Sequence, residues 1–246
     1  MNKGVAVAIL AAGKGTRMKR DDIPKVCNLV LGKPLIRYVV EQAESLAPEY
    51  IICIIGHQRE KVIEVLEDKD VRFVVQAEQL GTGHAVQQCA DVLRDFTGNL
   101  IVLSGDVPML QGSTLQALLE KHQAGGFKAT VLSALADDPS GYGRILRTAE
   151  DHFDRIVEHK DADESIRAIN EINSGIYVFD SPTLFAILPR ISNQNAQGEY
   201  YLPDALELIR RDGHDVGVEI SETFSEIQGI NTVDELKAVE IRMSAE

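Results

Sequence analysis

Short apolar runs alternate with amphipathic segments over the first half of the chain, and this pattern constrains the fold most. Five runs rich in β-branched residues predict buried strands, at Val5–Leu10, Tyr50–Ile55, Val71–Val75, Asn99–Ser104 and Lys128–Ala134. Between them, apolar residues recur at helical spacing in Pro34–Ser45, Glu60–Glu67, Gly83–Leu93 and Thr114–His122. Buried strands that alternate with helices predict a parallel sheet covered by helices on both faces, the doubly wound α/β class.

The second half of the chain follows a different pattern, which begins at about residue 135. The stretches GYGRILR, DRIVEHK and EINSGIYVFD predict strands separated by turns, and helical patterns follow at Ser181–Leu188, Pro203–Arg211 and after Asn231. No repeat or linker divides the sequence. We therefore expect one domain over residues 1–246, made of a first half (about 1–135), a sub-sheet that closes over it (about 136–230) and a C-terminal helix (231–246).

Composition and charge argue against several classes of function. The 246 residues carry a net charge of −13 and no long basic run, which disfavours nucleic acid as the main partner. No apolar stretch approaches the roughly 20 residues that cross a bilayer, so we expect no membrane partner. Cys27, Cys53 and Cys89 are widely spaced without a CxxC pair, which favours reduced packing residues of a cytoplasmic protein.

The first predicted strand runs into the loop AAGKGTRM at residues 11–18. Gly13 and Gly15 allow a tight turn and close approach to a ligand, and Lys14 and Arg17 suit a ligand that is an anion. A dinucleotide fingerprint needs a third glycine where Met18 stands, and the register of a P-loop also fails. By itself the loop is equally compatible with a surface turn that carries incidental cations.

Polar residues also follow the other predicted strands. Lys25 adds a second cation after Arg17, QAEQLGTGH at 76–84 places a glutamine and a Gly-Thr-Gly loop after the third strand, and SGDVP at 104–108 places Asp106 after the fourth. In a doubly wound sheet, ligands bind beyond the carboxyl ends of the strands, where the strand order reverses. We therefore expect one crevice with two glycine-rich loops, cations for phosphates and a carboxylate for a metal.

Taken together, these stretches resemble those of the sugar-1-phosphate nucleotidyltransferases, and most of all the pyrophosphorylase domain of N-acetylglucosamine-1-phosphate uridyltransferases. The matching stretches are LAAGKGTRM (10–18), PKV (24–26), QAEQLGTGHA (76–85), GDVP (105–108), DDPSGYGRI (137–145), IVEHKDA (156–162), EINSG (171–175), NAQGEYYLPD (195–204) and GIN (229–231). The resemblance implies a Rossmann-like mixed sheet of the nucleotide-diphospho-sugar transferase type, with a nucleotide-binding first half and a smaller sugar-binding sub-sheet.

The reaction implied by this resemblance joins UTP and N-acetyl-α-D-glucosamine 1-phosphate to give UDP-N-acetylglucosamine and pyrophosphate. The sugar phosphate attacks the α-phosphorus in line, so the protein must mainly neutralise charge and align two anions. The resemblance implies Arg17 and Lys25 as the catalytic residues, and Asp106 and Asn231 as the ligands of Mg²⁺. UTP and the sugar 1-phosphate are the expected partners.

The same resemblance implies the binding residues. It assigns the nucleotide to Leu10, Ala11, Ala12, Gly13, Gln76, Gly81 and Thr82, and the sugar to Gly143, Glu158 and Asn173. The Gln76 amide offers a donor and an acceptor that match the edge of uracil. Structural alternatives stay open: Asn231 is also a favoured helix N-cap, Glu158 a partner for neighbouring cations, and His84 is expected to be structural rather than catalytic.

The chain also departs from this family. Relatives of this type commonly continue into a left-handed β-helix that acetylates the sugar amine and forms a trimer, whereas this chain stops after DELKAVEIRMSAE without hexapeptide repeats. We therefore expect no acetyl transfer from these residues, and the oligomeric state stays open. Two alternative functions are the same chemistry with dTTP or another sugar 1-phosphate, and a non-catalytic nucleotide-sugar sensor. The presence of Arg17, Lys25 and Asp106 disfavours the sensor.

Overall fold

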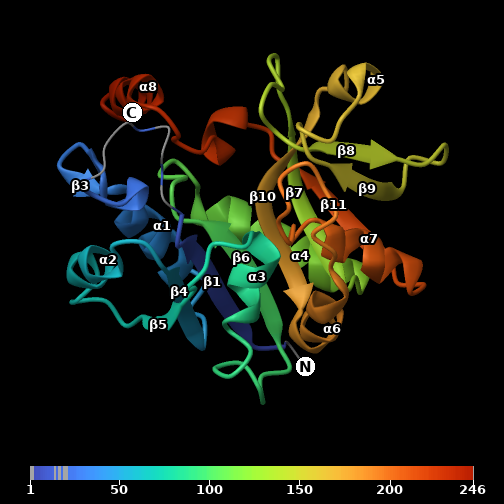
Figure 1. Cartoon of the computed structure of the whole chain (residues 1–246), viewed down its shortest axis with the longest axis horizontal. Helices are drawn as coiled ribbons and strands as arrows, with labels where there is room; N and C mark the ends of the chain where they lie inside the picture. The colour runs from blue at the N-terminus through green and yellow to red at the C-terminus, as the bar shows by residue number, and fades with distance from the viewer. Residues whose placement is uncertain (1–2, 14, 16–17, 19–21, 246) are drawn as a thin grey trace.

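A mixed β-sheet forms the centre of the computed structural model, which describes residues 3–13, 15, 18 and 22–245 (Figure 1). The strands of its main path follow the order β11 (Val216–Ile220), β7 (Ala129–Leu135), β10 (Glu171–Asp180), β6 (Asn99–Ser104), β1 (Val5–Ala11), β4 (Tyr50–Ile55) and β5 (Arg72–Val75). The strands predicted for the first half are all present, each within one residue of its expected bounds. The α/β class of the chain is therefore confirmed.

The strand directions agree with the predicted parallel sheet in one half and differ from it in the other. β1 pairs in parallel with both β4 and β6, and β4 pairs in parallel with β5. β10 lies between β6 and β7 and runs antiparallel to both, so β7 is not the neighbour of β6. β11, which the sequence pattern did not predict, adds a parallel strand beyond β7. The sheet is therefore mixed, which confirms what the resemblance implied, and its parallel part is centred on β1.

The smaller sub-sheet consists of β8 (Arg144–Arg147) and β9 (Phe153–Val157), which pair antiparallel. β8 joins the main sheet through a pairing of Arg144 with Ile172 of β10. We expected β10 within the sub-sheet, but its ten residues reach from there through the main sheet. The short helix α5 (Glu164–Arg167) follows β9, and Figure 1 shows this group projecting from one side of the molecule.

The C-terminal helix α8 (Val233–Met243) lies against the N-terminal part of the chain. It contacts the small hairpin of β2 (Leu29–Val30) and β3 (Lys33–Pro34), as Figure 1 shows. Ile230 and Val239 are buried there with Met18, Leu35 and Met109. This packing brings the segment before α8 back to the edge of the sheet where β1 and β6 end.

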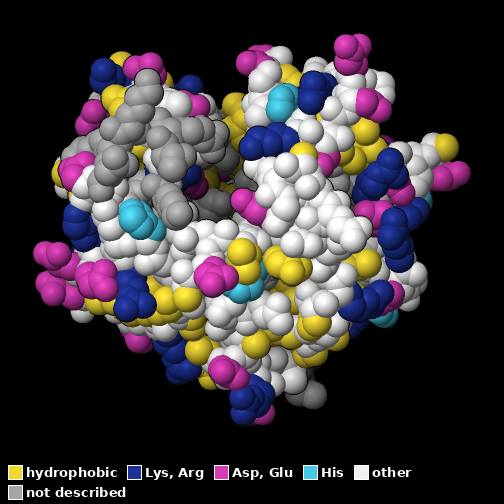
Figure 2. Space-filling view, in the orientation of Figure 1, with side chains coloured by type: hydrophobic (Ala, Val, Ile, Leu, Met, Phe, Trp, Pro, Cys, Tyr) yellow, Lys and Arg dark blue, Asp and Glu magenta, His cyan; other side chains and the backbone are white. Residues whose placement is uncertain are grey.

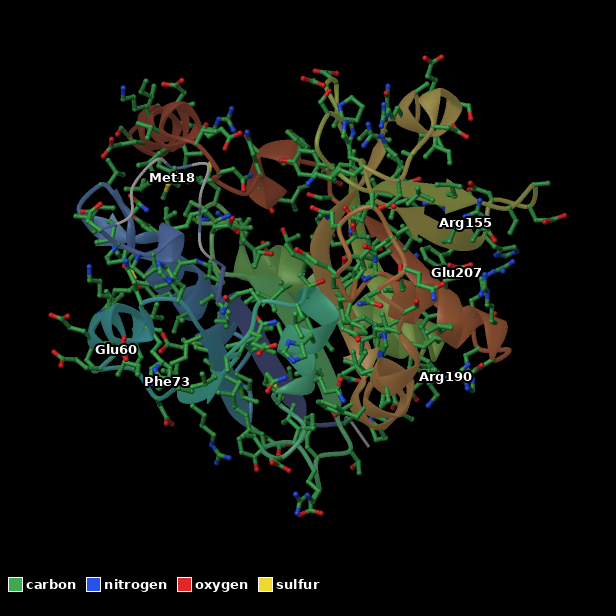
Figure 3. The ribbon with its side chains drawn as sticks, viewed as in Figure 1. Met18, Glu60, Phe73, Arg155, Arg190 and Glu207 are labelled. Carbon is green, nitrogen blue, oxygen red and sulfur yellow. The ribbon has the colours of Figure 1, made fainter. Side chains whose placement is uncertain are left out.

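The outer surface carries charges of both signs. In Figure 2, Lys and Arg side chains are scattered among Asp and Glu over this face and do not gather into one basic area. Figure 3 shows Glu60 on α2, Arg155 on β9 and Glu207 on α7 near the periphery of the molecule. No helix in the described part of the chain is long and apolar enough to span a membrane. The expected cytoplasmic location stays a prediction.

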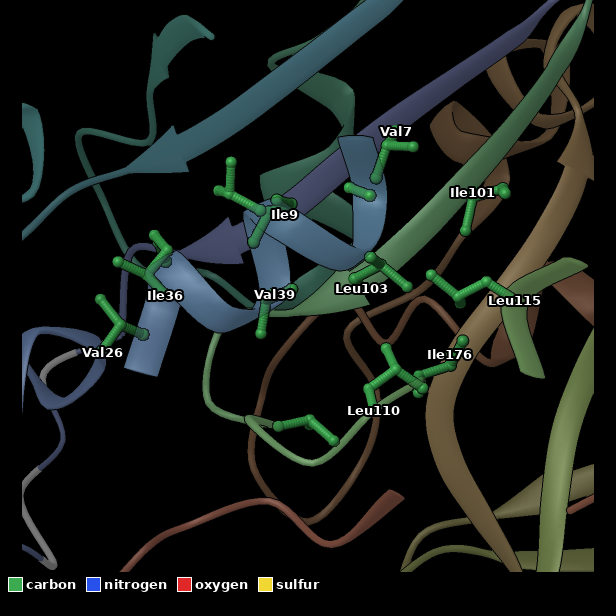
Figure 4. Close-up of a cluster of buried hydrophobic side chains, with 14 of the residues drawn as sticks. Val7, Ile9, Val26, Ile36, Val39, Ile101, Leu103, Leu110, Leu115 and Ile176 are labelled. Carbon is green, nitrogen blue, oxygen red and sulfur yellow. The ribbon is translucent and has the colours of Figure 1, made fainter. Parts of the chain in front are cut away.

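The core has two layers because side chains of a strand alternate between the two faces of the sheet. On one face, Val7 and Ile9 of β1 pack with Ile101 and Leu103 of β6 and with Val39 of α1 (Figure 4). The helices on this face are α1 (Leu35–Glu44), α2 (Arg59–Val65) and α4 (Gly112–Gly125), and those on the other are α3 (Thr82–Gln87), α6 (Ser181–Ile187) and α7 (Asp204–Arg211). Helices therefore cover both faces, as predicted.

The three cysteines are buried packing residues, as predicted, and each is a free thiol. Burial raises the pKa of Cys27 to about 11 and those of Cys53 and Cys89 to about 12. Because the thiolate is the reactive form, both burial and the raised pKa values suppress thiol chemistry in the folded chain.

We expect Ellman's reagent at about pH 8 to label essentially no cysteine of the native protein, since the reactive thiolate forms well above that pH. The same reagent in denaturant should label all three cysteines, which provides the control. Rapid labelling of any thiol in the native protein would contradict this packing of the core.

Candidate active site

A cavity of about 470 Å³ lies beyond the carboxyl ends of β1, β5 and β6. From β1 the chain continues to β4 and β5 on one side of it and then crosses to β6 on the other side, so this edge is the topological switch point of the sheet. The cavity is lined by the end of β1 from Leu10 to Gly13, by Gln76 after β5 and by Asp106 after β6. In Figure 2 the surface is hollowed between the side that carries α2 and the side that carries β8 and β9.

A second cavity, of about 350 Å³, adjoins the first on the side of the sub-sheet. Its lining includes Gly143, Glu158, Asn173 and Asn231. The two cavities share part of their lining, namely Leu10, Lys25, Thr82, Ser104 and Asp106. The residues predicted for the nucleotide therefore line the first cavity, those predicted for the sugar line the second, and the two meet at Lys25 and Asp106.

Lys25 stands at this meeting point. It begins a short 3₁₀ turn (Lys25–Cys27), and its ammonium forms an ion pair with Asp106 Oδ2. The same ammonium donates a hydrogen bond to Asn231 Oδ1 at 3.1 Å. Asp106 is 7% exposed, so the ion pair is largely shielded from water. Two oxygens from distant parts of the chain thus converge on one cation.

The structure also shows how Asn231 reaches Lys25. The amide of Ile230 donates to the carbonyl of Asp106 at 3.0 Å, and the amide of Asn231 donates to Glu235 Oε2 at 2.5 Å. The N-cap of α8 is Thr232, which forms a capping box with Glu235. Asn231 is therefore not the N-cap of α8, which was the structural alternative for this residue.

Two glycines bring loops close to these side chains. Gly15 has φ +62°, and a Cβ there would lie 2.6 Å from the Cβ of Lys25, so the backbone at Gly15 packs against Lys25. Gly81 has φ +109°, and a Cβ there would lie 2.6 Å from the carbonyl oxygen of Tyr200. The predicted catalytic Arg17 and the neighbouring Lys14 lie outside the described residues.

Gln76 lines the first cavity and is 3% exposed. Its Nε2 donates to the carbonyl oxygen of Gly81 at 3.0 Å and lies 3.1 Å from Nδ1 of His84. The amide nitrogen is thereby engaged within the protein. The predicted structural residue His84 thus contacts the side chain that we expect to bind the base.

The second cavity is built around a bulge in β10. The pairing of β10 with β7 shifts its register between Asn173 and Tyr177. The side-chain Nδ2 of Asn173 donates to the hydroxyl of Tyr177 at 2.8 Å, and the backbone N–H of Asn173 donates to the carbonyl oxygen of Gly143 at 2.9 Å. Burial raises the pKa of the Glu158 carboxyl, and a hydrogen bond from Asn173 opposes this shift. The cavity therefore presents polar groups held by one another, which suits a ligand with hydroxyls.

The sequence reasoning missed Ser104, Tyr177 and Glu199, which also line the cavities. Ser104 stands in the quoted SGDVP stretch, and the structure places it at the end of β6, opposite Leu10 of β1, in the lining of both cavities. Tyr200, the neighbour of Glu199, lines neither cavity; its carbonyl oxygen accepts from the amide of Gly83 and its amide donates to the carbonyl oxygen of Leu80, both at 2.8 Å.

The charge of the lining limits what the cavities can hold unaided. Among the described lining residues, Lys25 is the only cation, against the carboxylates of Asp106, Glu158 and Glu199. A triphosphate needs more positive charge than one ammonium supplies. Within the described residues, no group of three His, Cys, Asp or Glu side chains forms a metal cluster. A cation held partly by protein oxygens and partly by phosphates fits this lining.

Asp204 lies beside Pro203, which lines the second cavity. We expect ionisation of the Asp204 carboxyl to lower the free energy of unfolding as the pH rises. Burial, then Glu207 and Asp161, raises the pKa of Asp204 from 3.8 to about 6, so the native state binds this proton more tightly than the unfolded state. Asp204→Asn should therefore be more stable than wild type above about pH 6. The difference in stability should shrink as the pH falls from about 6 to 3.8. Urea unfolding across the pH range measures this, with the exposed Asp91→Asn as control; a pH-independent difference would contradict it.

The chain is similar to known nucleotidyltransferases over most of its length. The model of the family described as nucleotidyl transferase matches residues 6–222. Two relatives described as bifunctional protein GlmU, from Bacillus cytotoxicus and Bacillus mycoides, are each 47% identical to it over 235 residues. These residues make up 96% of this chain and 51% of each relative, so the chain spans about half the length of the curated relatives it matches.

A solved structure has the same fold. The crystal structure of a UDP-glucose pyrophosphorylase in complex with UDP-glucose aligns with a TM-score of 0.77, at 19% identity. The alignment covers 100% of this chain and 99% of that one. Family match, relatives and fold agree, and this chain belongs to the nucleotidyl transferase family of sugar-1-phosphate nucleotidyltransferases.

Proposed function

We propose that this protein joins UTP and N-acetyl-α-D-glucosamine 1-phosphate to form UDP-N-acetylglucosamine and pyrophosphate. The observation that carries the proposal is the meeting of the two cavities at Lys25 and Asp106. A nucleotide in the first cavity and a sugar phosphate in the second would bring their reacting phosphates together there. The GlmU relatives support this choice of reaction, since the chain is 47% identical to them over 96% of its length.

The reaction is an in-line displacement at the α-phosphorus of UTP. A phosphate oxygen of the sugar phosphate forms the new P–O bond, the bond to the β-phosphate oxygen breaks, and pyrophosphate leaves with its electron pair. Both reactants are anions, so the catalytic task is alignment and neutralisation of charge. Lys25, whose ammonium lies between the two cavities, would bind the phosphates at the reacting centre. We assign the leaving pyrophosphate to Arg17.

The residues at this point fit a magnesium ion. The Asp106 carboxylate and the Asn231 amide oxygen already converge on one cation, the Lys25 ammonium, and both are oxygen ligands of the kind that Mg²⁺ prefers. Asp106 and Asn231 would hold the ion, and when bound it would neutralise phosphate charge. Lys25 would then exchange its carboxylate partner for a phosphate oxygen, which keeps its ammonium paired.

Recognition of the two substrates would be divided between the cavities. Gln76 would read the uracil edge, and the backbone from Leu10 to Gly13 and at Gly81 would contact the nucleotide. Glu158 would accept hydrogen bonds from sugar hydroxyls, and Asn173 would lie beside it. Thr82 is held by the amide of Leu202, which donates to its Oγ1 at 3.0 Å, so its hydroxyl proton stays available to a ligand.

We test the four NTPs and dTTP, each with N-acetylglucosamine 1-phosphate and with glucose 1-phosphate, and expect pyrophosphate release to be fastest with UTP and N-acetylglucosamine 1-phosphate. A well-placed hydrogen-bonding pair discriminates between bases by about 1–3 kcal/mol, so CTP should be about 10- to 100-fold slower than UTP. A coupled pyrophosphate assay measures each rate. Turnover of UTP or dTTP only with glucose 1-phosphate would contradict the proposal and favour the alternative substrates.

We expect Asp106→Asn to lower kcat by about 10²-fold or more, because it removes a charged ligand from the reacting centre. The variant keeps the size of the side chain and an oxygen for Lys25, so its circular dichroism spectrum should match wild type. Asp91→Asn changes a carboxyl that is 88% exposed and provides the matched control. Full magnesium-dependent activity of Asp106→Asn would overturn the assignment of the metal site.

A further inference from the structure

We propose that His84 is a positioning residue for the base: its Nδ1 fixes the orientation of the Gln76 amide and thereby favours uracil over cytosine. The inference rests on the proposed function, since it takes the first cavity as the site of the nucleotide base. It adds a role that the sequence did not predict, because His84 was expected to be structural.

The contacts of Gln76 determine which way its amide faces. Nε2 donates one hydrogen to the carbonyl oxygen of Gly81 at 3.0 Å, and it lies 3.1 Å from Nδ1 of His84, within reach of a second hydrogen bond. A carbonyl oxygen can only accept, so the nitrogen and not the oxygen of the amide must face Gly81. This assigns the acceptor role to Nδ1 of His84 and places the ring proton on Nε2; Nε2 of Gln88, which lies 3.4 Å from that ring nitrogen, then donates only to the carbonyl oxygen of His84.

This arrangement leaves Oε1 of Gln76 to meet the ligand. Both hydrogens of the amide are engaged inside the protein, and Gln76 lines the first cavity. Reversal of the amide would set Oε1 against the carbonyl oxygen of Gly81 and the lone pair of His84. Because Gln76 is 3% exposed, water offers little compensation for two such acceptor–acceptor contacts. The carbonyl oxygen of Gly81 and Nδ1 of His84 therefore fix the orientation of the Gln76 amide.

A locked Oε1 distinguishes the two pyrimidines. Uracil presents a donor at N3, which Oε1 can accept, whereas cytosine presents an acceptor at N3, which Oε1 would repel. With His84 unable to accept, reversal of Gln76 would cost one unfavourable contact instead of two. The reversed amide presents its nitrogen to the base, and that nitrogen can donate to N3 of cytosine.

The backbone around His84 is held firmly enough for this role. The amide of Gly83 donates to the carbonyl oxygen of Tyr200 at 2.8 Å, and Thr82 Oγ1 accepts from the amide of Leu202 at 3.0 Å. Gln88 Nε2 donates to the carbonyl oxygen of His84 at 2.9 Å. The start of α3 is therefore anchored to the segment at 200–202, which leaves the His84 ring little freedom to move away from Gln76.

The test compares His84→Leu, which removes the acceptor, with His84→Asn, whose Oδ1 is bonded to Cγ as Nδ1 is in histidine. For each variant, kcat/KM is measured with UTP and with CTP at saturating sugar phosphate. We expect the UTP-to-CTP ratio to fall at least about tenfold in His84→Leu, the value of one hydrogen-bond mismatch, and to return in His84→Asn. In a Gln76→Ala background, His84→Leu should not change the ratio further.

The outcomes separate this inference from the proposed function. A wild-type protein without preference for UTP would refute the proposed function itself. A wild-type preference that survives in His84→Leu, or an equal loss for both nucleotides in His84→Leu and His84→Asn, would overturn the role of His84. If His84→Leu does not fold, His84→Phe takes its place, since it keeps a ring but has no nitrogen lone pair.

Discussion

The candidate site is centred on the ion pair of Lys25 with Asp106, at the carboxyl end of the parallel part of the sheet. Asp106 follows β6, and Lys25 lies on the 3₁₀ turn that comes after the glycine-rich loop, so the ion pair joins segments that follow two paired strands. The ammonium also reaches Asn231, which packing of the C-terminal segment brings to the same point. In a chain with a net charge of −13, this partly buried contact places one cation and its acceptors where the two cavities meet.

Local sequence patterns predicted the strands and helices that pack on both faces of the sheet. They could not predict which strands, distant in the sequence, pair with one another. β4 and β6 have the predicted bounds because buried parallel strands are continuous apolar runs bounded by turn residues. The insertion of β10 between β6 and β7 depends on contacts over long sequence separations, which no window of the sequence contains. α3 ends at Gln87 rather than near Leu93, since the amides of Gln88, Cys89 and Ala90 bond carbonyls three residues back.

Most of the site was predicted because its residues follow strands directly or belong to the quoted motifs. Asp106 and Gln76 follow β6 and β5, and the resemblance supplied Glu158, Asn173 and Asn231, which line the cavities. Tyr177 was missed because it enters the cavity through a bulge, which depends on how β10 pairs with β7. The contact of His84 with Gln76 was equally hidden, since it depends on the orientation of one amide. Arg17 lies outside the described residues, so its role stays a proposal.

The claim that Lys25, Asp106 and Asn231 form a site for a divalent cation and phosphates is tested most directly by anomalous diffraction. Crystals of the protein with Mn²⁺ and a non-reactive UTP analogue would be measured near the manganese absorption edge. The account predicts an anomalous peak between the Asp106 carboxylate and the Asn231 amide oxygen, with the Lys25 ammonium moved onto a phosphate. A peak elsewhere, with Lys25 still paired to Asp106, would contradict it.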